Sequence, residues 1–274
     1  MRRLLILLGL ALPPAAAAET IEWVLPDVPP IFIKEGPLRD TGFGDRQLRF
    51  LIGALPDFEH HIRLVPPGRL WFEMSHEDGI CSLGVAKTPE RAAFARFSDR
   101  SVRGSTAGVV IRSDRLEQFR PLLDGNGEIL LGKLAERGDL TGAYADSQFY
   151  DEAIDAFIAD PAKKTRRSAI ANVRLPLRLL ASGHADFGFG SILDLNYSPA
   201  MLGLRESFTL LRIAGDKSQR RVYVACSDRP AGRAAIARIN TLLEKPENFA
   251  AYLEPLRDWF GPAEFALTER DPGR

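Results

Sequence analysis

The sequence contains few of the residues and motifs that most cofactor sites require. Only two of its 274 residues are cysteine and only four are histidine. The histidines lack the His-x-x-x-His spacing with a nearby acid that would hold a metal ion. The Gly-x-Gly-x-x-Gly loop of dinucleotide-binding proteins and the Gly-x-Ser-x-Gly elbow of many hydrolases are also absent. We therefore expect no metal, no cofactor and no catalytic centre of these kinds.

Long hydrophobic runs are missing after the first dozen residues. Arg2 and Arg3 precede the apolar residues 4–12, and a run of alanines follows, which is the layout of a cleavable secretory signal. We expect residues 1–18 to be removed by cleavage near Ala18 and the mature chain to reach the periplasm. The apolar run is shorter than the roughly 20 residues that cross a bilayer. No cysteine stands at the cleavage point, so we expect no lipid anchor.

Charge of one sign is not in excess. The 36 basic residues, less Arg2 and Arg3, stand against 36 acidic residues, so the mature chain carries a net charge near −2. The sequence has no block of basic residues of the kind that binds nucleic acid. Nucleic acid is therefore not an expected partner. A hydrophobic content of 45% is enough for one large domain or for two lobes.

Short apolar strands alternate with amphipathic helices along the mature chain, which predicts an α/β fold. The expected strands are residues 21–25, 61–65, 80–85, 106–112, 140–145, 185–190, 208–213 and 222–226. Helices are expected after Gly42-Phe43-Gly44-Asp45, after Asp146-Ser147-Gln148, between Asn172 and Gly183, and from Phe249 to Phe260. Asp45 is expected to cap the first of these helices.

Two strands are expected to cross between two lobes, because each follows a polar or charged stretch. They are residues 106–112 and residues 222–226. If both strands cross, residues 19–104 together with about 227–274 build one lobe, and residues 105–226 build the other.

The segment Lys87-Thr88-Pro89-Glu90-Arg91 predicts a helix start, with Thr88 as N-cap and Pro89 as the first helical position. Arg91 falls in the first turn, where unpaired backbone N–H groups already make the field positive. A carboxylate or phosphate between the guanidinium and the helix start would receive hydrogen bonds from both. The alternative interpretation is an ordinary capped helix whose arginine pairs with a surface carboxylate.

The order of these features resembles the extracellular solute-binding proteins of family 3, two-lobed receptors that deliver small polar solutes to ABC importers. The resemblance is carried by Val28-Pro29-Pro30, Gly42-Phe43-Gly44-Asp45, Thr88-x-x-Arg91 with Phe97-Ser98, Gly183-His184-Ala185-Asp186 and Asp258-Trp259-Phe260. It implies the type 2 periplasmic-binding-protein fold, in which two mostly parallel sheets joined by two crossing strands close around a ligand like a Venus flytrap. Arg69, Cys81 and Cys226 are more similar to a poorly characterised cysteine-containing branch.

The resemblance also implies roles for individual residues. Arg91 would hold the carboxylate of the ligand, and Ser147 and Gln148 would offer donors from the opposite lobe. Ala86 stands where amino-acid binders usually carry Ser or Thr, and Ser191 where they often carry an acid. An organic acid or another anion-bearing solute is therefore at least as well matched as an α-amino acid. The ligand-binding candidates are Arg91, Thr88, Ala86, Arg69, Ser147, Gln148, Ser191, Tyr144 and Trp71.

Some of these residues have a structural interpretation as well. Arg69 is either a second anion contact or a surface side chain packed on Trp71. Tyr144 and Trp71 either face the cleft or belong to the core. Cys81 and Cys226 either form a disulfide in an oxidising compartment or remain two buried thiols.

These observations predict a periplasmic solute-binding protein rather than an enzyme. Its expected partners are a small-molecule solute and the permease of an ABC importer in the inner membrane, and we expect a monomer. One alternative is a cyclohexadienyl-dehydratase-like enzyme, with Glu73, Glu77 or Glu152 as general acid. The other is a ligand-sensing module for a membrane receptor such as a sensor kinase.

Overall fold

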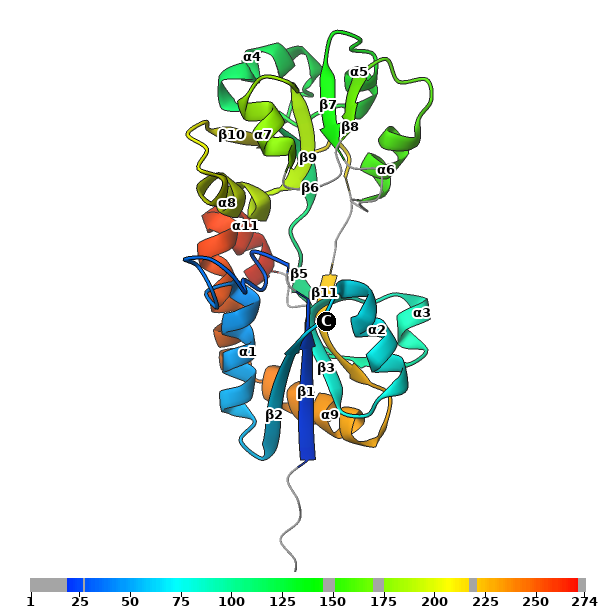
Figure 1. Ribbon diagram of the computed structural model, residues 1–274, viewed down its shortest axis with the longest axis vertical. Helices are drawn as coiled ribbons and strands as arrows, with labels where there is room; N and C mark the ends of the chain where they lie inside the picture. Colours follow the sequence, from blue (N-terminus) through cyan, green and yellow to red (C-terminus); the bar gives the residue numbers. More distant parts are fainter. Residues whose placement is uncertain (1–18, 27, 145–150, 170–174, 217–220, 271–274) are drawn as a thin grey trace, which may run out of the picture.

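The computed structural model describes residues 19–26, 28–144, 151–169, 175–216 and 221–270. It consists of two α/β bodies stacked along the long axis of the molecule (Figure 1). We call the body that holds strands β1 to β5 and β11 lobe one, and the body that holds β6 to β10 lobe two. The expected signal segment, residues 1–18, lies outside the described residues.

Lobe one is built on a sheet with the strand order β2-β1-β3-β11-β4, and β5 also pairs with β11. The strands are β1 (Glu19–Leu25), β2 (Phe58–Leu64), β3 (Ile80–Ala86), β4 (Ala95–Phe97), β5 (Val102–Arg103) and β11 (Arg221–Ser227). The helices are α1 (Phe43–Ala54), α2 (Pro67–His76), α3 (Pro89–Ala92), α9 (Pro230–Glu244), α10 (Pro246–Leu253) and α11 (Arg257–Arg270). Strand β1 is buried on both faces: Trp23 packs in one apolar cluster and Val24 in another, as expected for a parallel strand covered by helices on both sides.

Lobe two is built on a sheet with the order β10-β6-β9-β7-β8. The strands are β6 (Ala107–Arg112), β7 (Thr141–Tyr144), β8 (Arg166–Ala169), β9 (Phe187–Ser191) and β10 (Phe208–Leu211). The helices are α4 (Leu116–Phe119), α5 (Leu131–Ala135), α6 (Glu152–Ala159), α7 (Leu175–Ala181) and α8 (Ile192–Leu202). Its core is centred on Phe119, Tyr144 and Phe187, which are fully buried.

The two-lobed α/β architecture is confirmed, but the pairing within each sheet is mixed. Parallel pairs join β2, β1 and β3 in lobe one and β9, β7 and β8 in lobe two. The other pairs are antiparallel. Strands β4, β5 and β8 were not expected from the sequence, because their segments Ala-Arg-Phe, Val-Arg and Arg-Arg-Ser-Ala contain no run of apolar residues.

The strand expected at 222–226 lies in lobe one along its whole length. As β11 it pairs antiparallel with β3, β4 and β5. The strand expected at 106–112 pairs within lobe two as β6. The division of the chain into 19–104 with 227–274, and 105–226, stays a prediction. We call β5, residues 104–106 and the start of β11 the hinge; Figure 1 shows β5 and β11 at the level where the lobes meet.

Cys81 and Cys226 form a disulfide, which confirms the first of the two interpretations. The bond joins β3 to β11 at positions that are partners in the sheet, and both residues are fully buried in the core of lobe one. It links segments 145 residues apart in the sequence. The disulfide therefore joins β11, which comes after the lobe-two segment in the sequence, to β3, which comes before it.

Asp45 does not cap its own helix. The N-cap of α1 is Gly42, and no side chain accepts a hydrogen bond there. Instead Asp45 is buried, accepts a hydrogen bond from the backbone N–H of Ile33 at 3.0 Å and forms an ion pair with Lys34. A buried charge needs partners of this kind. The Asp45 carboxylate thereby links the loop after β1 to the start of α1.

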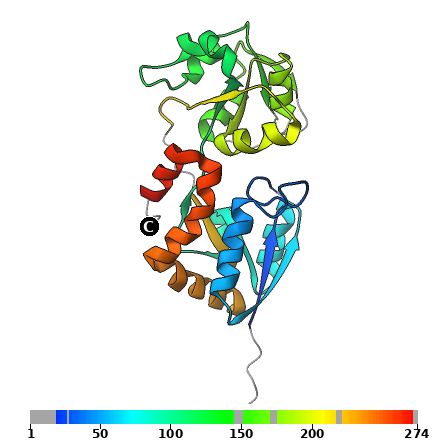
Figure 2. The same cartoon turned by 90° about the vertical axis from the view of Figure 1, so that its left-hand side faces the viewer.

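The C-terminal helical segment expected from Phe249 to Phe260 is divided into α10, a short 3-10 turn (Glu254–Leu256) and α11. Gly261 interrupts α11 with a φ of 72°, in the region that favours glycine. Helix α11 lies between α1 of lobe one and α8 of lobe two (Figures 1 and 2). The Asn196 amide on α8 donates to the carbonyl of Trp259 at 2.6 Å, so the C-terminal helix contacts both lobes.

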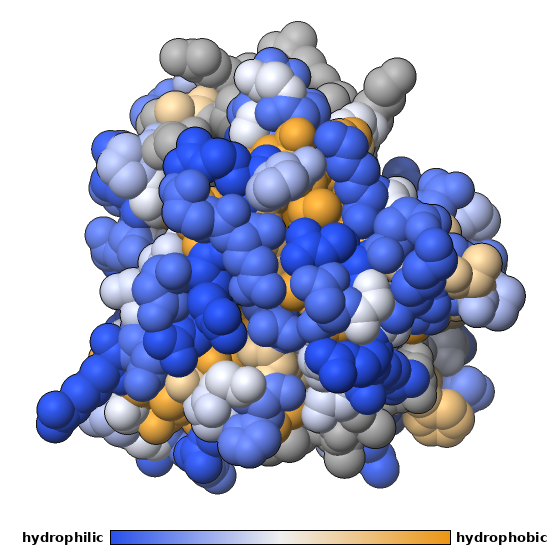
Figure 3. Space-filling view, turned by 90° about the horizontal axis from the view of Figure 1, so that it is seen from above, coloured by the Kyte–Doolittle hydropathy of each residue, from blue (hydrophilic) through white to orange (hydrophobic). Residues whose placement is uncertain are grey.

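The face seen from the lobe-two end is mostly hydrophilic, with small separate apolar areas (Figure 3). Among the described residues, no helix has both the length and the apolar character needed to cross a membrane.

Candidate functional site

Arg91 is held in a fixed position on lobe one. Thr88 caps α3 by accepting a hydrogen bond from the Arg91 backbone N–H at 3.3 Å. The Arg91 guanidinium donates to the Ala86 carbonyl at 2.9 Å, and its central carbon lies 4.0 Å from the centre of the Trp71 ring. Such a cation–π contact orients the flat guanidinium. Four of the predicted site residues, Arg91, Thr88, Ala86 and Trp71, therefore form one cluster, which we call the Arg91 cluster.

The helix start contributes less to this cluster than the sequence suggested. Helix α3 contains only four residues, Pro89–Ala92. A helix dipole grows by the alignment of successive peptide units, so a single turn has a weak one. The anion-binding potential of the Arg91 cluster rests on the guanidinium rather than on the helix.

Arg69 is not part of the Arg91 cluster. Its guanidinium pairs with Glu73 one turn further along α2, at 2.6 Å. Arg63 binds the same carboxylate at 3.0 Å. The guanidinium that lies over the Trp71 ring is that of Arg91, whereas Glu73 engages Arg69. That Arg69 contacts an anion stays a prediction.

Glu73 has the environment of a structural carboxylate. Its side chain is only 1% exposed. Burial alone would raise the pKa of Glu73, but the hydrogen bonds from Arg69 and Arg63 outweigh this effect and hold it below its usual value. A carboxyl group that stays ionised has no proton to give as a general acid near neutral pH.

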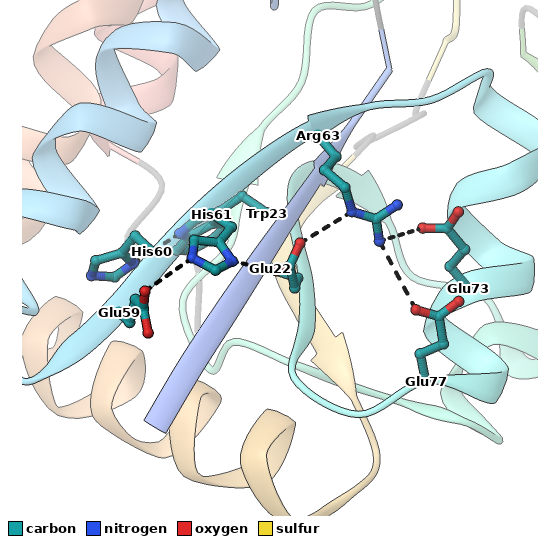
Figure 4. Close-up of polar contacts among 8 residues, drawn as sticks. All are labelled: Glu22, Trp23, Glu59, His60, His61, Arg63, Glu73 and Glu77. Carbon is teal, nitrogen blue, oxygen red and sulfur yellow. Dashed lines mark hydrogen bonds and ion pairs between the residues drawn. The ribbon is translucent and has the colours of Figure 1, made fainter. Parts of the chain in front are cut away.

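Glu73 belongs to a charged network on the outer side of β1 and β2. Figure 4 shows Arg63 between Glu22, Glu73 and Glu77, and His61 between Glu22 and Glu59. The hydrogen bonds that the His61 ring donates to Glu22 and then to Glu59 raise the pKa of His61 above its usual value. Each charged side chain of the network has a neighbour of opposite sign, which favours a structural role for the network.

Tyr144 lies in the core of lobe two. It is fully buried, and its ring centre lies 5.3 Å from that of Phe189 and 6.4 Å from that of Phe187. This position matches the core interpretation of Tyr144 and not the cleft one. Ser147 and Gln148 lie outside the described residues.

A cavity of about 250 Å³ lies between the lobes at the hinge. Lobe one contributes the loop 28–31, the start of α1, Gly84 and the helices α10 and α11. Lobe two contributes Ala107 and residues 190–194 at the start of α8, and the hinge contributes 102–105 and Val222. Of the predicted site residues, Ser191 lines this cavity, whereas the Arg91 cluster does not.

Two of the described charged side chains line the cavity, and neither was expected from the sequence. Arg103 comes from β5 in the hinge, and Asp194 from the first turn of α8. Asp194 accepts hydrogen bonds from the backbone N–H and the hydroxyl of Ser191, at 2.7 and 2.8 Å. Their positions in the sequence were the available signal: Arg103 lies in the polar stretch that leads into the strand expected at 106–112, and Asp194 lies three residues after Ser191.

In the described part of the chain, no group of three or more His, Cys, Asp and Glu side chains is placed to hold a metal ion.

The sequence matches no protein-family model and no curated protein. Solved structures do match the fold. The probable amino-acid ABC transporter extracellular-binding protein ytmK from Bacillus subtilis superposes with a TM-score of 0.64 at 14% identity, over 89% of this chain and 100% of that one. A mutant of ArgBP from T. maritima gives 0.58 at 17% identity, over 88% and 95%. A histidine kinase sensor domain with similarity to periplasmic binding proteins gives 0.59 at 17% identity, over 88% and 96%.

Identities this low establish a shared fold and nothing finer. The chain is a two-lobed α/β protein with the type 2 periplasmic-binding-protein fold, as the resemblance implied.

Proposed function

We propose that this protein is a periplasmic solute-binding protein, not an enzyme, that captures a small carboxylate-bearing solute between its lobes for delivery to an ABC importer. The observation that carries the proposal is the cavity lined by both lobes at the hinge. A solute that contacts both lobes stabilises one angle between them, and this population shift is how a two-lobed receptor signals that it is loaded. The names of solved structures with this fold, several of them ABC transporter binding proteins, support it.

The Arg91 cluster lies on lobe one outside the cavity lining, and the proposal assigns it to the carboxylate of a solute that extends beyond the cavity. Arg91 presents a flat, permanently charged fork, and its orientation is set by Trp71 and by the Ala86 carbonyl. A fork of this kind binds a carboxylate through two parallel hydrogen bonds. The charge and the geometry both favour an anion over a neutral sugar or a cation.

A thermal-shift screen against a solute library tests the function. A solute at a hundred times its dissociation constant adds about 2.7 kcal/mol to the free energy of unfolding, so a true ligand raises the melting temperature. Candidate solutes come from mass spectrometry of small molecules that copurify with the native protein. A library of carboxylates, amino acids and phosphates that leaves the melting temperature unchanged contradicts the proposal.

Substitution of Arg91 tests the site. Arg91→Ala is expected to weaken binding of the identified solute by about tenfold or more, because a charge-assisted hydrogen bond contributes about 1.5–3 kcal/mol. Arg238→Ala is the matched control: this arginine lies on α9, is half-exposed and pairs with Asp57. If Arg91→Ala and Arg238→Ala bind the solute equally well, the Arg91 cluster is not the site.

A sensory role is the second candidate, because a histidine kinase sensor domain shares the fold over 88% of this chain. The two roles require different membrane partners. Crosslinking of the loaded protein in native membranes distinguishes them: a permease partner supports transport, and a receptor kinase supports sensing.

A further inference from the structure

Arg103 is a charged side chain for which the described residues supply no partner. Among the described residues, its guanidinium makes no hydrogen bond or ion pair, and its Nε atom is buried without an acceptor. Asp194, the other charged residue of the cavity, already accepts two hydrogen bonds from Ser191. A buried donor with no acceptor costs free energy until a ligand or water supplies one.

The hinge places a second arginine directly opposite the first. Arg103 on β5 and Arg221 on β11 are partners across the antiparallel pair. Like charges at directly opposite positions destabilise a sheet. Arg221 also donates a hydrogen bond to the hydroxyl of Ser101 at 2.9 Å. Two arginines therefore lie next to each other in the hinge, which favours an anion over a cation near them.

The rest of the cavity is mainly apolar. Its wall includes Ile31, Phe43, Leu193, Leu256 and Phe260. Residues of this type gain free energy when an apolar group displaces water from between them. The described lining of the cavity therefore combines an apolar wall with one arginine, Arg103, to which the described residues offer no acceptor, and this combination matches an amphipathic anion.

We propose that the hinge cavity binds a small carboxylate with an apolar body, such as an aromatic or branched aliphatic acid, and that Arg103 binds its carboxylate group. The inference rests on the proposed function and narrows its solute class. A solute held in this way contacts Arg103 in the hinge, Phe43 in lobe one and Leu193 in lobe two. Because the solute contacts the hinge and both lobes, its binding would stabilise one angle between the lobes.

Four chemically matched probes test the proposal on the mature chain. Phenylacetate carries both a carboxylate and an apolar ring. Phenylacetamide lacks the charge, acetate lacks the apolar ring, and phenylalanine adds an ammonium group. Isothermal titration calorimetry is expected to show phenylacetate binding about tenfold or more tighter than phenylacetamide and acetate. Phenylalanine is expected to bind more weakly than phenylacetate. If phenylalanine binds and phenylacetate does not, the proposal is overturned, because the cavity then selects a zwitterion.

Substitutions of Arg103 test whether this residue causes the preference for phenylacetate over phenylacetamide. Arg103→Gln is expected to weaken phenylacetate binding about tenfold or more and to leave phenylacetamide binding unchanged. Arg103→Lys keeps the charge and is expected to retain part of the affinity. Ala107→Leu fills the cavity and is expected to weaken both probes, whereas Arg238→Gln changes neither. The melting temperature of each variant without a probe shows that it folds.

The results separate this inference from the proposed function. If a library solute binds in an Arg91-dependent way while phenylacetate binding is absent or insensitive to Arg103→Gln, the hinge subsite is overturned and the receptor function stands. If phenylacetate binds with the expected Arg103 dependence while no solute binds in an Arg91-dependent way, the hinge subsite stands and the assignment of carboxylate binding to the Arg91 cluster is overturned.

Discussion

The Arg91 guanidinium carbon lies 4.0 Å from the centre of the Trp71 ring, so these two side chains are stacked on the surface of lobe one. Arg91 is on α3 and Trp71 on α2, and neither position predicts the other from sequence spacing. The ring holds the guanidinium flat, which is the orientation that a bidentate contact with a carboxylate needs.

The first prediction concerns this stacking. Trp71→Leu removes the ring face and is expected to weaken binding of the identified solute by about 3- to 30-fold, since a cation–π contact contributes about 0.5–2 kcal/mol. Trp71→Phe keeps a ring and should lie between the wild type and Trp71→Leu. Calorimetric titration measures the three affinities. Equal affinities would show that Trp71 does not orient Arg91 for binding.

The second prediction concerns the disulfide between Cys81 and Cys226. It closes a loop with a sequence separation of 145 residues. Replacing both cysteines with alanine is expected to lower the free energy of unfolding by about 2–5 kcal/mol, because the unfolded chain gains conformational freedom. Denaturant titration with and without a reducing agent measures the change. The reducing agent should destabilise the wild type and leave the double variant unaffected; a double variant as stable as the oxidised wild type would contradict the prediction.

The third prediction compares two glycines of α1. A Cβ on Gly44 would lie 2.8 Å from the Ile31 carbonyl oxygen and 2.9 Å from the Phe32 ring, whereas a Cβ on Gly53 meets nothing within 4 Å. Gly44→Ala is expected to destabilise the protein by about 1–3 kcal/mol through overpacking. Gly53→Ala is expected to stabilise it by about 0.5–1 kcal/mol, because alanine favours the helix. Thermal unfolding of both variants checks the opposite signs, and a shared sign would refute the argument.

The fourth prediction concerns His61. Its hydrogen bonds to Glu22 and Glu59 raise its pKa above the ordinary value of 6.5. The folded state therefore favours the protonated ring, so this contribution to stability is complete below pH 6.5 and is lost as the pH rises through the folded-state pKa. An NMR titration should show the raised pKa in the wild type and a lower one in Glu59→Gln. A wild-type pKa at or below 6.5 would contradict the structure of this network.

Local sequence patterns predicted the elements that are long enough to repeat an apolar position. The strands β1, β3 and β6 are examples, because each is six or seven residues long and contains three or four buried apolar side chains. Short strands such as β5 have no such signal, since their pairing partners are supplied by β11. The partner of Arg69 was within reach of the sequence, because Glu73 lies four residues later, at the spacing of one helical turn.

The sequence by itself determined the alternation of strands and helices, the balanced charge and the presence of two cysteines, because composition and periodicity are properties of neighbouring residues. Only the tertiary structure decided that Arg91 meets Trp71 and that Arg103 faces a cavity opposite Arg221. These contacts join segments that are distant in the chain, and the packing of two lobes around a hinge brings them together.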